Sequence, residues 1–98
     1  MPIEKNKLFV IIDETLEPIY GCVQAGHAVA QWLIEHPNGQ WHNDYLIYLK
    51  GEVNEWAHKL DLLGIDYSVF KEPDLNGKMT AIAIHSNDRL FRKVNLYI

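Results

Sequence analysis

Short runs of apolar residues along the chain predict four β-strands. The first run, Leu8–Ile12, is continuous and rich in β-branched residues, which is typical of a strand buried on both faces of a sheet. Further runs predict strands at Tyr45–Leu49, Ile65–Phe70 and Thr80–Ile84. The last two are separated by Pro73–Gly77, where Pro, Asn and Gly residues indicate a tight loop.

The segment Tyr20–Glu35 predicts the first helix, starting near Pro18 and stopped by Pro37–Gly39. It carries no charged residue before Glu35, and apolar side chains cover well over half of the helical circumference. The remaining narrow stripe is polar but uncharged and consists of Tyr20, Gln24, His27 and Gln31. Surface helices usually expose Lys and Glu, so two interpretations stand: a nearly buried core helix, or a helix that lines a site.

A second helix is predicted over Val53–Leu63, with Gly64 as its C-terminal cap and charged residues on its outer face. Ser86 can cap a short final helix through about Val94. Helical crossovers make the first three strands parallel, and the short loop makes the last strand antiparallel. The order predicts an α/β fold, a three-layer α/β/α sandwich around a mixed four-stranded sheet.

Ligands of such sheets bind in the crevice outside the carboxyl ends of the parallel strands. Asp13 follows the first strand, and Lys71 and Glu72 follow the third. The start of the first helix reaches the same rim, so we expect these groups to lie near one another.

Composition restricts the classes of protein to which the chain can belong but does not indicate a particular function. Ninety-eight residues are expected to form one domain with a small core, for which dimerisation is a natural way to cover leftover apolar surface. Cys22 is the only cysteine, so an internal disulfide is impossible, and no histidine spacing indicates a metal site. The formal charge of −4 argues weakly against broad nucleic-acid binding. No apolar N-terminal segment or membrane-spanning run occurs, so we expect a cytoplasmic protein with no membrane association.

Three segments resemble the type 2 peptidyl-tRNA hydrolase family. They are the strand Leu8–Ile12, the Gln-Ala-Gly-His-Ala sequence at Gln24–Ala28, and the Gly-Lys-Met-Thr-Ala-Ile-Ala-Ile run at Gly77–Ile84. The ending Asn95-Leu96-Tyr97 is also similar to that family's terminus. The similarity covers nearly the whole chain. It implies a small homodimeric α/β/α enzyme, without metal or cofactor, that hydrolyses the ester between a peptide and the 3′ ribose of tRNA.

The resemblance assigns catalytic positions to Gln24, His27 and Thr80, with Glu72 nearest the position of a family aspartate. The rim and its loop supply the expected substrate-binding residues, which are Asp13, Tyr20, Lys71 and Lys78. Ester hydrolysis needs an activated water, a stabilised oxyanion and a proton for the leaving oxygen. Glu72, Asp13 or His27 can act as base, and Thr80 and Gln24 can orient water or the oxyanion.

Two features depart from the family pattern. Tyr20 stands where the family has a basic residue, and the loop Pro73–Asn76 is short and lacks the family's Gly-Arg-Thr. Each motif residue also has a purely structural interpretation. His27 can be a satisfied structural residue, Gln24 a surface or sheet-contacting amide, and Thr80 a β-branched strand residue. Two alternatives to the peptidyl-tRNA hydrolase therefore stay open: a non-catalytic binding domain on the same fold, and a hydrolase for another small ester or amide.

Overall fold

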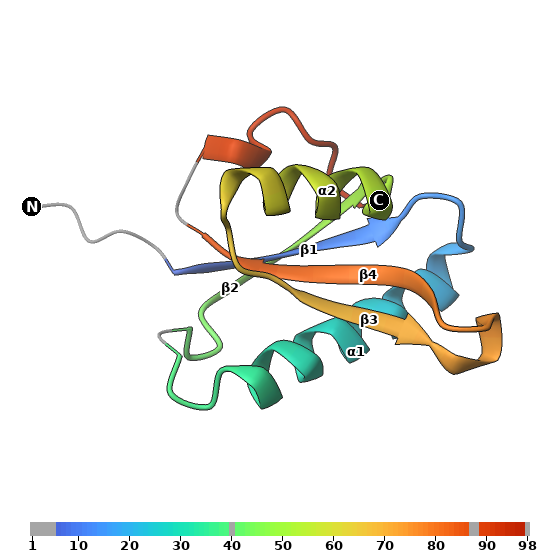
Figure 1. Cartoon of the computed structure of the whole chain (residues 1–98), viewed down its shortest axis with the longest axis horizontal. Helices are drawn as coiled ribbons and strands as arrows, with labels where there is room; N and C mark the ends of the chain where they lie inside the picture. The colour runs from blue at the N-terminus through green and yellow to red at the C-terminus, as the bar shows by residue number, and fades with distance from the viewer. Residues whose placement is uncertain (1–5, 40, 87–88, 98) are drawn as a thin grey trace, which may run out of the picture.

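Four strands form one mixed sheet between two helices in the computed structural model, which describes residues 6–39, 41–86 and 89–97 apart from the Arg89 side chain. The elements follow in the order β1 (Lys7–Asp13), α1 (Pro18–Glu35), β2 (Tyr45–Gly51), α2 (Val53–Leu63), β3 (Ser68–Glu72), the 3₁₀ helix η1 (Pro73–Leu75), β4 (Lys78–His85) and the 3₁₀ helix η2 (Arg89–Phe91). Helix α1 covers one face of the sheet, and α2 covers the other (Figure 1). The predicted three-layer α/β sandwich is therefore confirmed.

The last strand lies inside the sheet, whose order is β2-β1-β4-β3. Strands β1 and β2 are parallel, and β4 runs antiparallel to both β1 and β3. Strands β1 and β3 thus point the same way, as predicted, and their carboxyl ends lie at one end of the sheet. The loop between β3 and β4 turns at Asn76 and Gly77, both with positive φ, which asparagine and glycine tolerate best.

The alternation of residues along the strands divides the core into two layers. Leu8, Val10 and Ile12 of β1 face α1, where they pack with Ala25, Ala28 and Trp32. The intervening Phe9 and Ile11 face α2 and pack with Val53 and Leu60. This pattern explains why β1 reads as a continuous apolar run: it is a strand with a helix on each face.

Local signals fix the ends of both helices. Pro18 occupies the first turn of α1, where the missing N–H costs nothing. The Glu52 carboxylate caps α2 by accepting hydrogen bonds from the backbone N–H groups of Asn54 and Glu55. Gly64 closes α2 with φ of 70°, as predicted. Among the residues described, neither helix has the length and hydropathy needed to cross a membrane.

The bounds of all four strands and of the final helix differ from the prediction. Strands β1 and β2 extend one or two residues beyond the predicted runs. Strand β3 begins at Ser68 rather than Ile65, because the Ile65 N–H bonds to the Leu60 carbonyl and completes the end of α2. Strand β4 is longer than predicted. The final helix is only the short η2, and the expected stretch from Ser86 passes through residues 87 and 88, which lie outside the described residues.

The interpretation of α1 as a nearly buried helix is wrong. Only Gly21, Gln24, Ala25, Ala28 and Trp32 are buried, and they form the face that meets the sheet. The opposite face is exposed although it is apolar. It consists of Ile19, Cys22, Val23, Gly26, Ala30, Leu33 and Ile34, and we call it the apolar face of α1.

Candidate functional site

The neutral stripe of α1 lies along β3 and β4. Gln24 contacts Thr80 of β4, and His27 contacts Phe70 of β3. Tyr20, one turn before Gln24, lies close to the carboxylates at the end of β3. The stripe therefore leads from the rim of the sheet along one flank of α1, as the site-lining interpretation of this helix requires.

A β-bulge aims Thr80 at α1. The register of β3 and β4 pairs Phe70 with Ala81 but Lys71 with Met79, so Thr80 has no partner on β3. Regular alternation would send Thr80 to the opposite face from Ala81, toward α2. The extra residue instead lets the Thr80 hydroxyl donate a hydrogen bond of 2.6 Å to Oε1 of Gln24. Bulges that redirect one side chain in this way are common beside active sites.

Gln24 and Thr80 form a buried pair rather than an open catalytic surface. Their exposed fractions are 1% and 0%. Two motif residues that are 56 positions apart therefore meet, as the resemblance implies, but they meet inside the α1 layer of the core. In this arrangement they hold the helix and the bulged strand together, and neither contacts solvent.

Glu72 is an enclosed carboxylate at the end of β3. The residue is 8% exposed, and its carboxylate oxygens are not among the fully buried polar atoms that lack a partner in the described part of the chain. Partial burial raises the pKa of the Tyr20 phenol, and the carboxylates of Glu72 and Asp74 raise it further. The phenol therefore keeps its proton at neutral pH and remains a hydrogen-bond donor beside Glu72.

Asp13 is engaged differently at the same rim. Its carboxylate accepts hydrogen bonds from the backbone N–H and the hydroxyl of Thr15, at 2.9 and 2.8 Å. Its other oxygen lies 3.3 Å from Nζ of Lys78. Burial by itself raises the pKa of Asp13, but the hydrogen bonds from Thr15 and the Lys78 ammonium outweigh it and hold that pKa below its usual value. Asp13 is thus an ionised anchor for Lys78.

Lys78 pairs with one carboxylate of the rim and lies across the strand register from the other. It lies opposite Glu72 in the register of β3 and β4 and forms the ion pair with Asp13. Its side chain is nearly half exposed, so part of the ammonium faces solvent. Lys71, on the outer strand β3, is exposed, and no contact of it with the rim groups is seen among the described residues.

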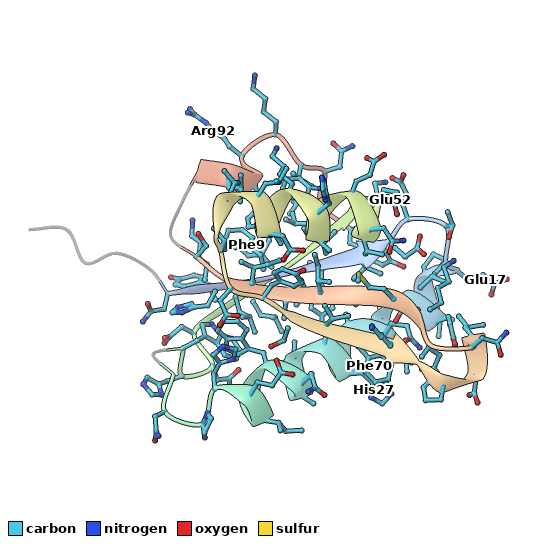
Figure 2. The ribbon with its side chains drawn as sticks, in the orientation of Figure 1. Phe9, Glu17, His27, Glu52, Phe70 and Arg92 are labelled. Carbon is cyan, nitrogen blue, oxygen red and sulfur yellow. The ribbon has the colours of Figure 1, made fainter. Side chains whose placement is uncertain are left out.

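His27 is exposed and stacks on Phe70. The two rings are 4.4 Å apart between centroids and inclined by 13°, and Figure 2 shows them side by side, one on α1 and one on β3. The outer surface of the imidazole forms a flat aromatic platform on the stripe.

The structure brings seven of the eight predicted site residues to this flank and rim, with Lys71 beside them on the edge strand. Three cavities lined by described residues lie elsewhere. They have volumes of about 590 Å³ beside the outer edge of β2, 350 Å³ between α1 and the start of β2, and 460 Å³ between α2 and η2.

A second polar cluster at the opposite end of α1 was not predicted. Nε2 of His36 lies 2.7 Å from the Asp66 carboxylate, and the His36 ring stacks on Trp32. Nearby, Nε2 of His85 is buried and has no hydrogen-bond partner among the residues described. No sequence spacing connects these side chains, because they come from the end of α1, the loop before β3 and the end of β4. Within the described parts of the chain, no group of three His, Cys, Asp or Glu side chains could hold a metal ion.

Comparison with known proteins finds the same fold in another protein but no family. No protein-family model matches the chain, and no curated protein matches it. The protein of unknown function Atu0240 from Agrobacterium tumefaciens strain C58 has a similar structure, with a TM-score of 0.70. The match covers 98% of this chain and 100% of that chain at 10% sequence identity. The fold is shared. At this identity the comparison carries no information on activity.

Proposed function

We propose that the protein is an ester hydrolase similar to the type 2 peptidyl-tRNA hydrolases, with Glu72 as its general base. The observation that carries this proposal is the position of Glu72, a mostly buried residue at the rim whose carboxylate lies close to the protonated phenol of Tyr20. The position of Glu72 at the carboxyl end of a parallel-oriented strand supports the same conclusion.

The exposed groups around Glu72 fit the steps of ester hydrolysis. The Glu72 carboxylate accepts a proton from a water as that water attacks the ester carbonyl carbon. The Tyr20 hydroxyl donates a hydrogen bond to the oxyanion that forms. When the C–O bond breaks, the leaving ribose oxygen takes the proton back from Glu72. The atoms balance without a metal or cofactor.

The remaining motif residues act by position. The hydrogen bond between Thr80 and Gln24 fixes the distance between α1 and β4, and therefore between Tyr20 on the helix and the rim. The exposed His27 ring offers a stacking surface for a terminal base of the substrate. Lys78 and Lys71 supply positive charge for a phosphate near the rim. Gln24 and Thr80 are thus positioning residues in this proposal.

The test is release of labelled tRNA from peptidyl-tRNA by purified protein. Glu72→Gln keeps the shape of the side chain but removes the base, and a decrease of about 10²- to 10⁴-fold is expected. Asp74→Asn is the matched control, because Asp74 is an exposed carboxylate two residues away in η1, and its activity is expected to stay within about threefold of the wild type. No release above buffer by well-folded protein would refute the proposal, and so would full activity of Glu72→Gln.

A non-catalytic binding domain is the second candidate, and one observation favours it. Gln24 and Thr80 are completely enclosed, and Lys78 is already paired with Asp13, which leaves fewer free groups than an enzyme of this family would use. This candidate predicts tRNA or small-ester binding that Tyr20→Ala weakens, without turnover. Hydrolysis lost in Glu72→Gln would exclude it.

The third alternative, a hydrolase for another small ester or amide, differs in its dependence on salt. Contacts with tRNA phosphates release counterions, so tRNA affinity must fall as salt rises. Turnover of a small model ester that is insensitive to salt, combined with no tRNA binding, would favour this alternative.

A further inference from the structure

Three basic side chains surround one cavity on the α2 side of the sheet. The cavity has a volume of about 460 Å³ and lies between α2 and η2, and we call it the α2–η2 cavity. Six residues line it, three apolar or aromatic and three basic, which are Trp56, Leu90, Val94, Lys59, Arg92 and Lys93. The neutral stripe of α1 lies on the other side of the sheet (Figure 1). The steps proposed for ester hydrolysis use none of these six residues.

The apolar wall of the α2–η2 cavity is held in place by the fold. The Trp56 indole packs against Phe91 of η2, with 5.2 Å between the ring centroids and 49° between the planes. A Cβ added at Gly51 would lie only 3.1 Å from Nε1 of Trp56, so the indole also lies close against the backbone of β2. Leu90 and Val94 are partly buried and pack on the same core layer. The cavity therefore has preformed apolar walls, which are typical of small-molecule sites.

The basic groups are placed where an anion can reach them. Nζ of Lys59 lies over the Trp56 ring, 4.8 Å from its centroid, and this cation–π contact holds one positive charge at the apolar wall. Arg92 and Lys93 are exposed, and Figure 2 shows the Arg92 side chain projecting outward beside η2. One cation is thus positioned by the fold, and two more are accessible from solvent.

The positive charge of the α2–η2 cavity runs against the charge of the whole chain, which has 9 basic and 13 acidic residues. No ion pair of Lys59, Arg92 or Lys93 with a carboxylate is seen among the described residues. On α2 itself, Glu55 and Asp61 do not line the cavity, and Asp61 already accepts a hydrogen bond of 2.8 Å from a tyrosine hydroxyl. Neighbouring like charges repel, so a bound anion would relieve this repulsion as well as add attraction.

We propose that the α2–η2 cavity binds a small phosphate monoester with an apolar body. The Arg92 guanidinium can donate two parallel hydrogen bonds to phosphate oxygens, and the two lysine ammonium groups add positive charge. A doubly negative phosphate matches three cations better than a singly negative carboxylate does. The apolar walls cover the body of the ligand, and the volume lies in the range of small-molecule sites. A nucleic-acid strand fits less well, because its charge extends over many phosphates whereas these cations surround one cavity.

Nuclear magnetic resonance of the isotope-labelled full chain tests the site, with 1-naphthyl phosphate as the probe. The Trp56 indole N–H signal, identified through Trp56→Phe, is expected to shift saturably with a dissociation constant below about 1 mM. The indole signals of Trp32 and Trp41, which lie in the α1 layer of the core, are expected to stay in place. Inorganic phosphate carries only the charged head and 1-naphthol only the apolar body, so each is expected to bind at least about tenfold more weakly. The carboxylate 1-naphthoate is also expected to bind more weakly than the phosphate ester.

Charge-removing variants test which residues hold the phosphate. Lys59→Gln, Arg92→Gln and Lys93→Gln are each expected to weaken binding about two- to fivefold, and the triple variant at least about tenfold. Lys50→Gln is the matched control, because Lys50 follows Leu49 of the α2 layer and so lies on the α1 side of β2; its affinity is expected to stay within about twofold of the wild type.

Three results would overturn the proposal. They are the absence of a saturable Trp56 shift at about 5 mM probe, an equal effect of Lys50→Gln and Lys59→Gln, and tighter binding of 1-naphthoate than of 1-naphthyl phosphate. Oligouridine provides the last comparison. If it binds more tightly than the probe and loses affinity in the triple variant, the cavity belongs to a nucleic-acid surface and the proposal is wrong. None of these measurements depends on ester hydrolysis.

Discussion

The hydrogen bond between Thr80 and Gln24 is the most direct place to test the structural argument. Thr80→Val preserves the shape of the side chain and removes only the hydroxyl. Oε1 of Gln24, a residue that is only 1% exposed, then lacks its donor. Leaving a buried acceptor unsatisfied costs about 1–3 kcal/mol. A value near 2 kcal/mol corresponds to a decrease in Tm of about 8–16 °C for a domain of this size.

A double-mutant cycle separates the hydrogen bond from packing. Gln24→Leu alone leaves the Thr80 hydroxyl without its acceptor, whereas Thr80→Val with Gln24→Leu removes both polar partners. Replacing both partners by apolar groups is far less costly than removing one. We therefore expect the double variant to be about 1–2 kcal/mol more stable than the sum of the single effects.

Urea denaturation followed by circular dichroism measures all four proteins, at one protein concentration because dimerisation would make stability depend on concentration. Gln31→Leu is the control, since Gln31 is on the same stripe but makes only an exposed hydrogen bond, to Glu35. Its effect is expected to stay within about 0.5 kcal/mol. A Thr80→Val effect below about 0.5 kcal/mol, or strict additivity in the cycle, would refute the buried pair.

Three further predictions concern charge and helix propensity. Burial raises the pKa of Asp13, but hydrogen bonds from Thr15 more than compensate and lower it. The stabilisation by the ionised Asp13 is therefore present above about pH 4 and disappears as the pH falls through the folded-state pKa. Urea unfolding is expected to show that Asp13→Asn costs about 1–2 kcal/mol at pH 7 and much less at pH 3. Burial lowers the pKa of His36, but the hydrogen bond to Asp66 more than compensates and raises it. The stabilisation by protonated His36 is therefore complete below about pH 6.5 and lost as the pH rises through the folded-state pKa. Thermal unfolding is expected to show that His36→Gln costs about 0.5 kcal/mol at pH 5.5 and nearly nothing at pH 8.5. Gly26→Ala is expected to stabilise the protein by about 1 kcal/mol, and a loss of stability there would contradict the open space around this residue.

The strands and helices were predictable because local patterns determine them. The β-branched run at Leu8–Ile12 can be satisfied only between two apolar layers, and Gly64 ends α2 through a backbone conformation that glycine adopts at little cost. The antiparallel last strand followed from the short Pro73–Gly77 loop. Its place between β1 and β3 did not, because it depends on which edges remain unpaired once the first strands have assembled.

The direction of single side chains depended on tertiary structure and could not be predicted. Thr80 turns toward α1 only because the pairing of β3 and β4 contains a bulge, which no local sequence signal marks. The exposed side of α1 was equally hidden. Apolar residues such as Val23 and Ile34 have the same periodicity whether they contact a sheet, a second chain or nothing.

The inserted position of β4 also dictates when the fold can form during synthesis. Strand β3 pairs with β4 in the sheet, and β4 joins β1 through contacts such as Val10 with Ala83, more than 70 positions apart. A nascent chain that ends before Lys78 can build β1, α1 and β2, but it lacks β4, the strand with which β3 pairs. Such long-range pairing slows folding, and the sheet can be completed only after the final fifth of the chain, which begins with β4, has been synthesised. Nascent chains halted before and after β4 are therefore expected to differ sharply in resistance to proteolysis.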